Sequence, residues 1–348
     1  MTRSAEKVAV LLSGGVDSSV VALKAVENFG KPNVVAYTLI LHRGNFEDAE
    51  RAQKVARFLG IEHRVLDLRE EFTREVIDYF VQEYRKGRTP NPCAVCNQRI
   101  KLGLAVKRLL PEGFTKILTG HYVRKIDFSG YPTLARGLDR KKDQSYFLAK
   151  LDPKLLKFLE FPLGELTKEE VKNIAAKAGL PTASRKESQD ICFLEGKKVV
   201  QFLRDYIPPS AGVFIYKGKV VGKHKGYYGY TIGQRRGLGL RLGKPVYVVD
   251  IDASTNTVIV GDREDLATRE VTLEELTLFV PPELWKNLYG QVRYRTPSQK
   301  VENFKFEPPE GTDKLRLKFE EPFYGVAKGQ IGALYLDDRI LVAGGIIS

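Results

Sequence analysis

The stretch Val8-Ala-Val-Leu-Leu-Ser-Gly-Gly-Val-Asp-Ser-Ser19 decides the fold of the first part of the chain. Residues 8–12 form an apolar run that is typical of a buried parallel strand. Small residues at 13–15 favour a tight turn, and a helical pattern over residues 18–29 follows and ends at Gly30. A strand, a small-residue turn and a helix in this order predict the first unit of an α/β domain.

The alternation of strand and helix continues downstream of Gly30. Further strands are predicted at 34–41, 64–68 and 117–119, and helices at 47–59, 70–85 and 98–110. This order predicts a doubly wound parallel sheet, whose ligands bind at the carboxyl ends of the strands. Another helix is expected at 167–178, because Thr167 and Glu170 form a capping box. His42 and His63 stand at strand edges, and we interpret both as structural.

The sequence changes character after Pro209, where glycine, tyrosine and β-branched residues dominate. Short alternating runs predict strands at 213–216, 245–251, 257–260, 291–294, 315–319 and 332–336. We therefore expect two small β-rich domains after the α/β domain, the last of them barrel-like. The expected domains are residues 1–197, 198–268 and 269–348.

Charge and hydropathy narrow the class of protein. The 348 residues include 56 Lys and Arg against 43 Asp and Glu, a formal net charge of +13. A polyanionic partner would explain this excess, with a basic proteome or a thermophile surface as the alternative. No stretch approaches the roughly 20 apolar residues of a membrane span, and the polar start lacks the apolar run of a secretory signal. We therefore expect a cytoplasmic protein without a membrane partner.

The turn at 13–15 is predicted to bind a phosphate group. Gly14 and Gly15 allow the backbone to approach a ligand, and the following helix offers free N–H groups and a positive dipole end. No lysine follows the glycines, which excludes the G-x-x-x-x-G-K-[ST] loop. Asp17 would repel a phosphate unless a cation lies between them, so Mg²⁺ is expected there. The alternative is a helix capped by Asp17 with nothing bound.

Three cysteines, Cys93, Cys96 and Cys192, make an odd number that argues against a disulfide framework. Cys93 and Cys96 lie in a proline-bounded stretch that we interpret as a loop, with Asn97 capping the helix that follows. Cys96 would then stand at a helix N-terminus, where the dipole lowers a thiol pKa and favours a nucleophile. The alternatives are inert thiols, a zinc site completed by His121 or an acid, and a four-iron cluster on all three cysteines.

A basic and aromatic segment lies at 217–244. It contains no acidic residue, and Tyr227, Tyr228 and Tyr230 are interleaved with its basic residues. These are Lys217, Lys219, Lys223, Lys225, Arg235, Arg236, Arg241 and Lys244. Basic groups bind phosphates and aromatic rings stack on bases, so an RNA-binding surface is predicted, with a solvated basic face as the alternative. Residues 293–295 form a smaller candidate on the strand predicted at 291–294.

Several motifs together carry a resemblance to a known family. SGGVDS at 13–18 is similar to the pyrophosphate loop of the ATP pyrophosphatases, which cleave ATP between its α and β phosphates. The other matching motifs are NPCAVCN at 91–97, GHY at 120–122, KDQSYFL at 142–148, SQDICF at 188–193, YTIGQRRGLG at 230–239 and GQ at 329–330. The combination resembles the tRNA-specific 2-thiouridylases over nearly the whole chain.

This resemblance implies ATP-dependent 2-thiolation of the wobble uridine of tRNA, by adenylation of the base O2 and sulfur transfer from a cysteine persulfide. Cys192 would carry the persulfide, Cys96 would resolve it through a transient disulfide, and Asp17 would take part in catalysis. The residues expected to bind ATP are Leu11, Leu12, Ser13, Gly14, Gly15, Val16, Asp17, Ser18, Leu39 and Gly120. Those expected to touch tRNA are Asn91, Pro92, Cys93, His121, Lys142, Asp143, Gln144, Arg235, Arg236, Arg293, Tyr294 and Gln330. ATP with Mg²⁺, tRNAs with lysine-, glutamate- and glutamine-type anticodons, and a sulfur-relay protein or cysteine desulfurase are the implied cofactors and partners.

Cys93 departs from the family pattern, because many members have aspartate there. A third cysteine favours a variant in which Cys93, Cys96 and Cys192 hold a [4Fe-4S] cluster that carries hydrosulfide. This variant stays open beside the persulfide scheme, which we prefer. Two other functions also stay open: another ATP pyrophosphatase acting on RNA, such as an amidotransferase-type ligase, and an RNA-binding module with a vestigial nucleotide site.

Overall fold

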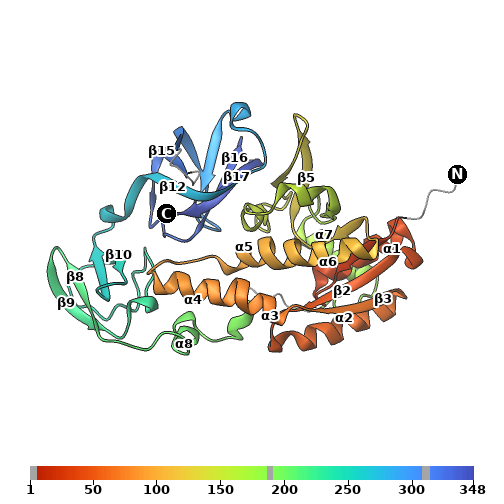
Figure 1. The fold of residues 1–348 in the computed structure, drawn as a ribbon, viewed down its shortest axis with the longest axis horizontal. Coiled ribbons are helices and arrows are strands. Elements are labelled where there is room, and N and C mark those ends of the chain that lie inside the picture. The colour runs from red at the N-terminus through yellow and green to blue at the C-terminus, as the bar shows by residue number, and fades with distance from the viewer. Residues whose placement is uncertain (1–5, 186–190, 308–313) are drawn as a thin grey trace.

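The computed structural model describes residues 6–185, 191–307 and 314–348, and their strands form three sheets (Figure 1). The first sheet has five parallel strands in the order β3-β2-β1-β4-β7. Their bounds are Val8–Leu11 (β1), Val34–Ile40 (β2), Glu62–Asp67 (β3), Lys116–Leu118 (β4) and Leu159–Glu160 (β7). The strand order reverses beside β1, so the predicted doubly wound sheet is confirmed.

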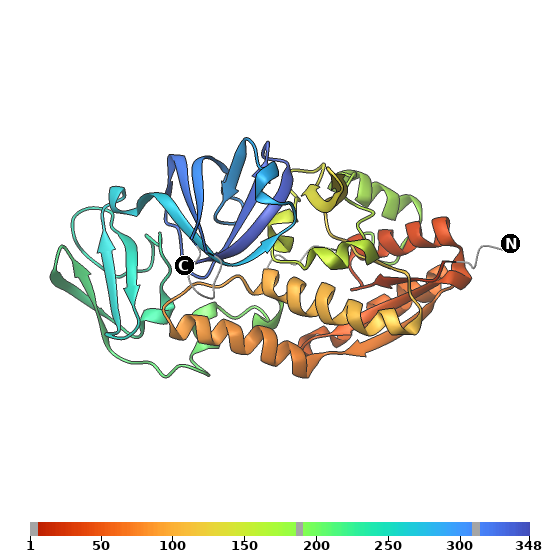
Figure 2. The same ribbon diagram turned by 45° about the horizontal axis from the view of Figure 1, so that its top comes forward.

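Helices cover both faces of this sheet (Figure 2). One face carries α1 (Val16–Phe29), α2 (Phe46–Leu59) and α7 (Lys168–Lys177). The other carries α3 (Arg69–Phe72), α4 (Asp78–Arg85), α5 (Pro92–Cys96) and α6 (Ala105–Leu109), with π-helical turns at Thr73–Ile77 and Asn97–Leu104. Along β1, Val8 and Val10 belong to one core and Ala9 to the other. A strand buried on both faces must be apolar throughout, which explains the run at 8–11.

The helix that carries the C-x-x-C begins at Pro92, not at the predicted residue 98. Asn91 is its N-cap, because the Asn91 side chain accepts a hydrogen bond from the Ala94 N–H at 3.1 Å. Proline at the first helical position leaves no N–H unsatisfied and is preset for the helical backbone. Residues 89–91 form a loop as predicted, but the predictions of a loop at 92–97 and of a cap at Asn97 were wrong, because both cysteines lie inside the helix.

A π-helical turn separates the two halves of this helix. It spans Asn97–Leu104, and its wider i→i+5 spacing places Lys101 one turn beyond Cys96. A Cβ on Gly103 would lie 2.2 Å from the Gln98 carbonyl oxygen, so only glycine fits the turn as it stands. Gly103 thus permits the wide turn that directs both Cys96 and Lys101 to one side.

The chain after residue 208 forms the two predicted β-rich units. A four-stranded sheet has the order β10-β11-β8-β9, with β8 at Gly212–Tyr216, β9 at Lys219–His224, β10 at Tyr247–Asp252 and β11 at Thr257–Gly261. Six further strands, joined in a ring by the β12–β17 pairing, form a closed barrel. They are Ala267–Leu278 (β12), Leu288–Gln291 (β13), Gln299–Glu307 (β14), Lys314–Tyr324 (β15), Ile331–Leu336 (β16) and Ile340–Ile347 (β17). The predicted barrel is confirmed, but the strand predicted at 291–294 is wrong, because β13 ends at Gln291 and residues 293–295 form a turn.

Several contacts tie the barrel to the α/β domain. A hairpin of β5 (Val123–Phe128) and β6 (Tyr131–Arg136), not predicted from sequence, pairs with β17 and extends the barrel sheet. The stretch before α5 is fixed as well, since the Gln330 side chain donates to the Thr89 carbonyl oxygen at 2.7 Å. In the part of the chain that the structure describes, no helix combines the length and apolar character that a membrane span requires.

Candidate nucleotide and thiol site

A cavity of about 410 Å³ opens at the carboxyl ends of β1, β2 and β4. Seven of the residues predicted to bind ATP line it: Leu11, Leu12, Ser13, Asp17, Ser18, Leu39 and Gly120. The other three, Gly14, Gly15 and Val16, form the turn and the first residue of α1 beside it. The cavity is therefore where a doubly wound sheet is expected to bind its ligand.

The turn between β1 and α1 leaves the start of the helix open to an anion. Gly15 is the N-cap of α1, and no side chain caps the helix. The Ser13 N–H instead donates to Ser18 Oγ at 3.2 Å, which holds the turn against the first helical turn. Asp17 lies inside the helix and does not cap it, so the alternative of an Asp-capped helix does not describe this turn. Free N–H groups and the helix dipole can bind phosphate here.

Replacing Gly14 with alanine is expected to unfold this turn and destabilise the protein by about 2–4 kcal/mol. Gly14 has φ +67°, and an added Cβ would lie 2.7 Å from the Asp48 carbonyl oxygen and 2.8 Å from Arg51 Cβ. Urea denaturation measures the loss. Gly15→Ala is the matched control, because its φ is −93° and its nearest heavy atom would be Ser13 Oγ at 3.5 Å. Equal stability of the two variants would contradict this account.

The Asp17 carboxylate is paired with the ammonium of Lys168. Lys168 Nζ lies 2.6 Å from Asp17 Oδ1, and the Tyr122 hydroxyl donates to the same oxygen at 2.7 Å. Lys168 thus supplies part of the positive charge that the sequence assigned to Mg²⁺ alone. Both contacts use Oδ1, so Oδ2 is the oxygen with which Asp17 would bind a cation that accompanies the nucleotide.

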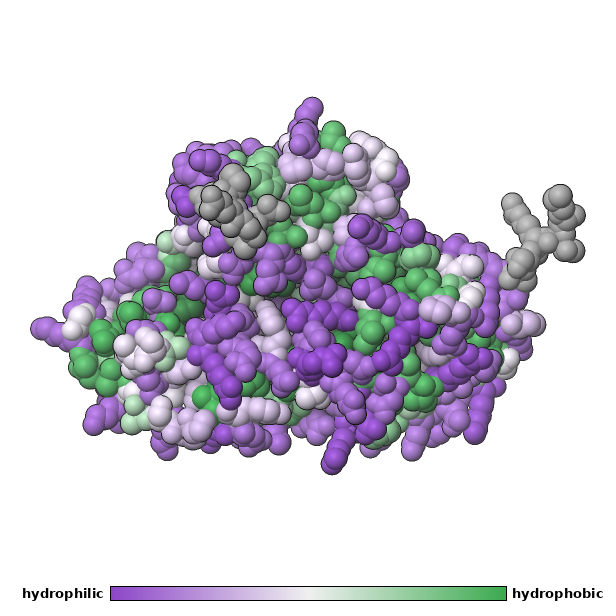
Figure 3. Space-filling view, in the orientation of Figure 1, coloured by the Kyte–Doolittle hydropathy of each residue, from purple (hydrophilic) through white to green (hydrophobic). Residues whose placement is uncertain are grey.

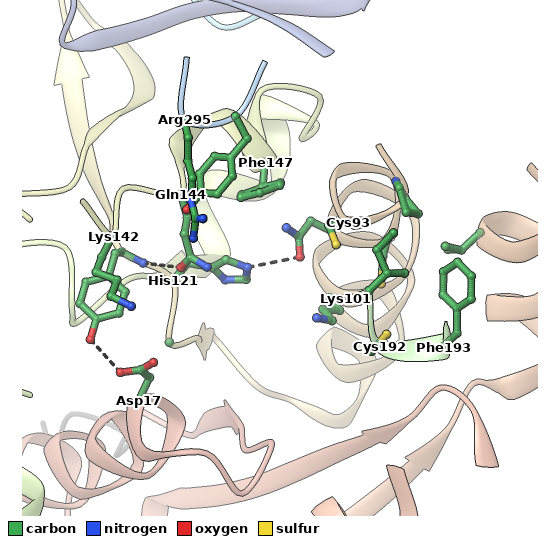
Figure 4. Close-up of a pocket in the computed structure, with 18 of the residues that line it drawn as sticks. Asp17, Cys93, Lys101, His121, Lys142, Gln144, Phe147, Cys192, Phe193 and Arg295 are labelled. Atoms are coloured by element: carbon green, nitrogen blue, oxygen red, sulfur yellow. Dashed lines mark hydrogen bonds between the residues drawn. The ribbon is translucent and has the colours of Figure 1, made fainter. Parts of the chain in front are cut away.

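A second cavity, of about 370 Å³, contains the three cysteines (Figure 4). Cys93 and Cys96 enter it from α5, and Cys192 enters it from the short 3-10 turn Cys192–Leu194. The folded chain thus brings Cys96 and Cys192 to one cavity. Six residues line this cavity and the nucleotide cavity alike: Asp17, Lys101, Gly120, His121, Gln144 and Cys192. The two cavities are therefore neighbours that share a border.

The electrostatics of Cys96 differ from the prediction. Cys96 is buried, with 5% of its surface exposed, and burial raises the pKa of its thiol to about 12. The expected lowering was wrong, because Cys96 is the last residue of α5, where the helix N-terminus is too far away to offset burial. At neutral pH Cys96 is a protonated thiol.

Cys192 is the ionisable thiol of the site. Burial raises its pKa, but a hydrogen bond with His42 and the charge of Lys101 outweigh burial and bring the pKa below the ordinary value. The Cys192 contact in turn raises the pKa of His42, whose Nδ1 lies 3.4 Å from Glu195 Oε1. His42, which we interpreted as structural, thus lines the nucleotide cavity and interacts with Cys192. Its position just after β2, at the ligand-binding edge of the sheet, was the available signal.

His121 lines both cavities as a neutral side chain. Its Nδ1 pairs with Thr119 Oγ1 at 2.8 Å and its Nε2 with Asn97 Oδ1 at 3.2 Å. Burial and the nearby Lys101 charge lower its pKa to about 3. His121 can therefore hydrogen-bond a ligand, but it brings no positive charge.

The residues predicted to touch tRNA divide into three groups. Pro92, Cys93, His121, Lys142, Gln144 and Tyr294 line the thiol cavity. Arg235, Arg236 and Arg293 are exposed outside it, on the loop between β9 and β10 and on the turn after β13. Asn91, Asp143 and Gln330 hold the backbone in place.

Asp143 and Gln330, two residues of the last group, contribute to the site by holding the backbone and do not line the thiol cavity. Asp143 is buried, and its carboxylate accepts hydrogen bonds from Arg136 at 3.1 Å and from the Gly137 N–H at 2.9 Å. Gln330 holds the stretch that leads to Asn91, the cap of α5. These side chains position the cavity wall that carries Gln144 and Cys93.

The basic segment at 217–244 lies on the four-stranded sheet and its loops. Two of its lysines pair with one acid outside the segment, since Lys244 Nζ and Lys217 Nζ lie 2.6 and 3.7 Å from the Asp262 carboxylate. Arg235 and Arg236 remain exposed. Hydrophilic residues cover most of the face seen in Figure 3, with apolar residues in small groups.

Among the described residues, no group of three or more His, Cys, Asp or Glu side chains comes close enough to hold a metal ion. The motif residues Ser188, Gln189 and Asp190 lie outside the described residues.

Three family models match the chain in succession. Residues 6–196 match a tRNA methyl transferase HUP domain, residues 200–262 a tRNA methyl transferase PRC-barrel domain, and residues 268–347 an aminomethyltransferase beta-barrel domain. Among curated proteins, the tRNA-specific 2-thiouridylase MnmA of Aquifex aeolicus is 43% identical, over 98% of this chain and 98% of that protein. The protein of the same name from Persephonella marina is 44% identical, over 98% and 99% of the two chains. That of Treponema denticola is 42% identical, over 98% and 97%.

Proposed function

The chain belongs to the family of tRNA-specific 2-thiouridylases and is a tRNA sulfurtransferase, and we propose that it thiolates the wobble uridine in two steps. Adenylation of the base O2 comes first, and sulfur transfer from a persulfide on Cys192 follows. ATP is the source of the adenylyl group.

The border shared by the two cavities carries this proposal. ATP bound at the turn after β1 would extend its α-phosphate toward residues that also face the thiols. A uridine inserted between Cys93 and His121 would then present its O2 to the phosphate and its C2 to the sulfur. The family models are described as methyl transferase domains. A nucleotide cavity beside three thiols nevertheless suits sulfur transfer, because methyl transfer does not need three thiols.

Adenylation makes the base reactive, because a carbonyl oxygen is a poor leaving group. O2 attacks the α-phosphorus, the O–P bond forms, pyrophosphate leaves, and the base loses its N3 proton. The first N–H groups of α1 and the Asp17–Lys168 pair surround the phosphates. The protein contributes positioning and charge stabilisation at this step.

Sulfur transfer uses the two unlike thiols in turn. The outer sulfur of the Cys192 persulfide attacks C2, and AMP leaves with the electron pair of the C2–O bond. Cys96 then attacks Cys192 Sγ, the bond to the transferred sulfur breaks, and its electron pair stays on the base. Cys96 must lose its proton to attack as the thiolate, and this proton replaces the N3 proton that the base lost earlier. A thiol reductant must afterwards reduce the Cys96–Cys192 disulfide.

The cluster alternative requires Cys93, Cys96 and Cys192 to lie close enough to bind one [4Fe-4S] cluster, and the described residues do not meet this requirement. All three line one cavity, but no three ligands come close enough to hold a metal ion. We therefore derive no step through a cluster.

The proposed function is tested by reconstitution. Purified protein, unmodified tRNA with a glutamate-type anticodon, ATP, Mg²⁺ and a persulfide donor are expected to give 2-thiouridine, measured by mass spectrometry of tRNA digests. Pyrophosphate release should depend on tRNA and match the product in amount. The preparation is purified anaerobically and assayed for iron and sulfide, since activity that requires bound iron contradicts the persulfide route. Pyrophosphate release without 2-thiouridine would indicate another ATP pyrophosphatase.

A further inference from the structure

Lys101 is a cation at the border of the two cavities that the sequence did not single out. It projects from the π-helical turn Asn97–Leu104, one turn beyond Cys96, and lines the nucleotide and thiol cavities alike. Figure 4 shows its side chain pointing from the helix into the cavity beside Cys192. In sequence it is one lysine in a helical pattern, and such a lysine is usually solvated.

The ammonium of Lys101 has no ion-pair or hydrogen-bond partner among the described residues. The groups that face it are the thiols of Cys93, Cys96 and Cys192 and, farther away, the Asp48 carboxylate. Burial lowers the pKa of Lys101, but the charges that these neighbours carry when ionised raise it more, so its pKa lies above the ordinary value and the ammonium keeps its proton. An ammonium that lines a cavity without a contacting partner can bind an anionic ligand there, which suggests that an anion completes this site.

The position of Lys101 identifies that anion, given the proposed function. The adenylated base must have its AMP in one cavity and its C2 in the other, so the C2–O–P linkage crosses their border. Six described residues line that border. His121 is neutral, Asp17 is an anion, and Gly120, Gln144 and Cys192 carry no positive charge. Lys101 is the cation among these six.

We propose that Lys101 is a catalytic residue that binds the oxygens of the C2–O–P linkage and stabilises the charge that develops on them as AMP leaves. The C2–S bond forms, the C2–O bond breaks, and its electron pair passes to the phosphate oxygen that the ammonium faces. Lys101 needs to give up no proton in this step, because AMP leaves as an anion. A cation placed before the reaction stabilises such charge without reorganisation.

The test compares Lys101→Met, Lys101→Arg and the control Lys107→Met in single-turnover thiolation with the full chain. Lys107 is exposed on α6 of the same helix. We expect Lys101→Met to lower 2-thiouridine formation by about 100-fold or more, as loss of a preorganised charge does. Pyrophosphate release should fall much less, and tRNA binding should not change. Lys101→Arg should recover most of the rate, and Lys107→Met should behave like the unaltered protein.

Thermal unfolding separates this role from a structural one. Removing an unpartnered ammonium should leave the melting temperature of Lys101→Met unchanged or higher, although its thiolation is lost. Thiolation by Lys101→Met at the unaltered rate overturns the proposal. So does an equal loss of pyrophosphate release and tRNA binding, which would make Lys101 a binding residue. If the unaltered protein makes no 2-thiouridine, the proposed function itself fails, and the role of Lys101 fails with it.

Discussion

Replacing Cys192 with serine is expected to lower 2-thiouridine formation by about a thousandfold or more, while tRNA still binds and pyrophosphate is still released. Serine has nearly the shape of cysteine, so the border of the two cavities keeps its form. A hydroxyl cannot carry a persulfide, and its high pKa leaves it protonated. Mass spectrometry of tRNA digests measures the product, and a pyrophosphate assay measures the first step.

The other two cysteines are the matched comparisons. Cys96→Ser should also stop turnover, but only after one sulfur has reached the base, so a tRNA–protein adduct through Cys192 should accumulate. Cys93→Ser should keep most of the activity, because the persulfide scheme gives Cys93 no bond to make. Normal thiouridine from Cys192→Ser would remove that residue from the mechanism. Equal loss of activity in all three variants would instead favour the cluster alternative.

The α/β domain could be predicted because its signals are local. The strand, turn and helix at 8–29 lie next to one another in sequence, and the capping box of Thr167 and Glu170 forms as predicted. The β5–β6 hairpin was missed, since its pairing with β17 joins residues 135 and 340, and no local pattern reveals such a partner.

The site residues also differ in whether a local motif reveals them or only contacts between distant parts of the chain do. The resemblance carried by the motifs at 13–18 and 91–97 implied that the nucleotide turn and the thiols serve one reaction, and the structure places them on neighbouring cavities. The pKa of Cys96 could not be predicted, because it depends on how deeply the neighbouring helices and the segment around Phe193 bury the end of α5. His42 and Lys101 lie beside Cys192, more than ninety residues away from either of them in sequence, so their place in the site appears only in the fold.

Replacing His42 with glutamine is expected to shift the reactivity of Cys192 to higher pH and to lower thiolation at neutral pH. Burial alone would raise the pKa of Cys192, and the hydrogen bond and charge of His42, with Lys101, reverse that effect. A lowered pKa means that the thiolate persists to lower pH than in an ordinary cysteine. Glutamine brings no charge, so the pKa should rise and the thiolate should disappear at a higher pH than before.

Alkylation of Cys192 by iodoacetamide, followed by mass spectrometry between about pH 6 and pH 9, measures this shift. The rate at neutral pH should fall about tenfold for each pH unit by which the profile moves, and thiolation should recover partly at the alkaline end. His63→Gln is the control, because His63 Nε2 pairs with Thr38 Oγ1 at 2.8 Å and lines neither cavity. An unchanged alkylation profile in His42→Gln would show that Lys101 alone ionises Cys192, since Lys101 is the other positive charge that lowers its pKa.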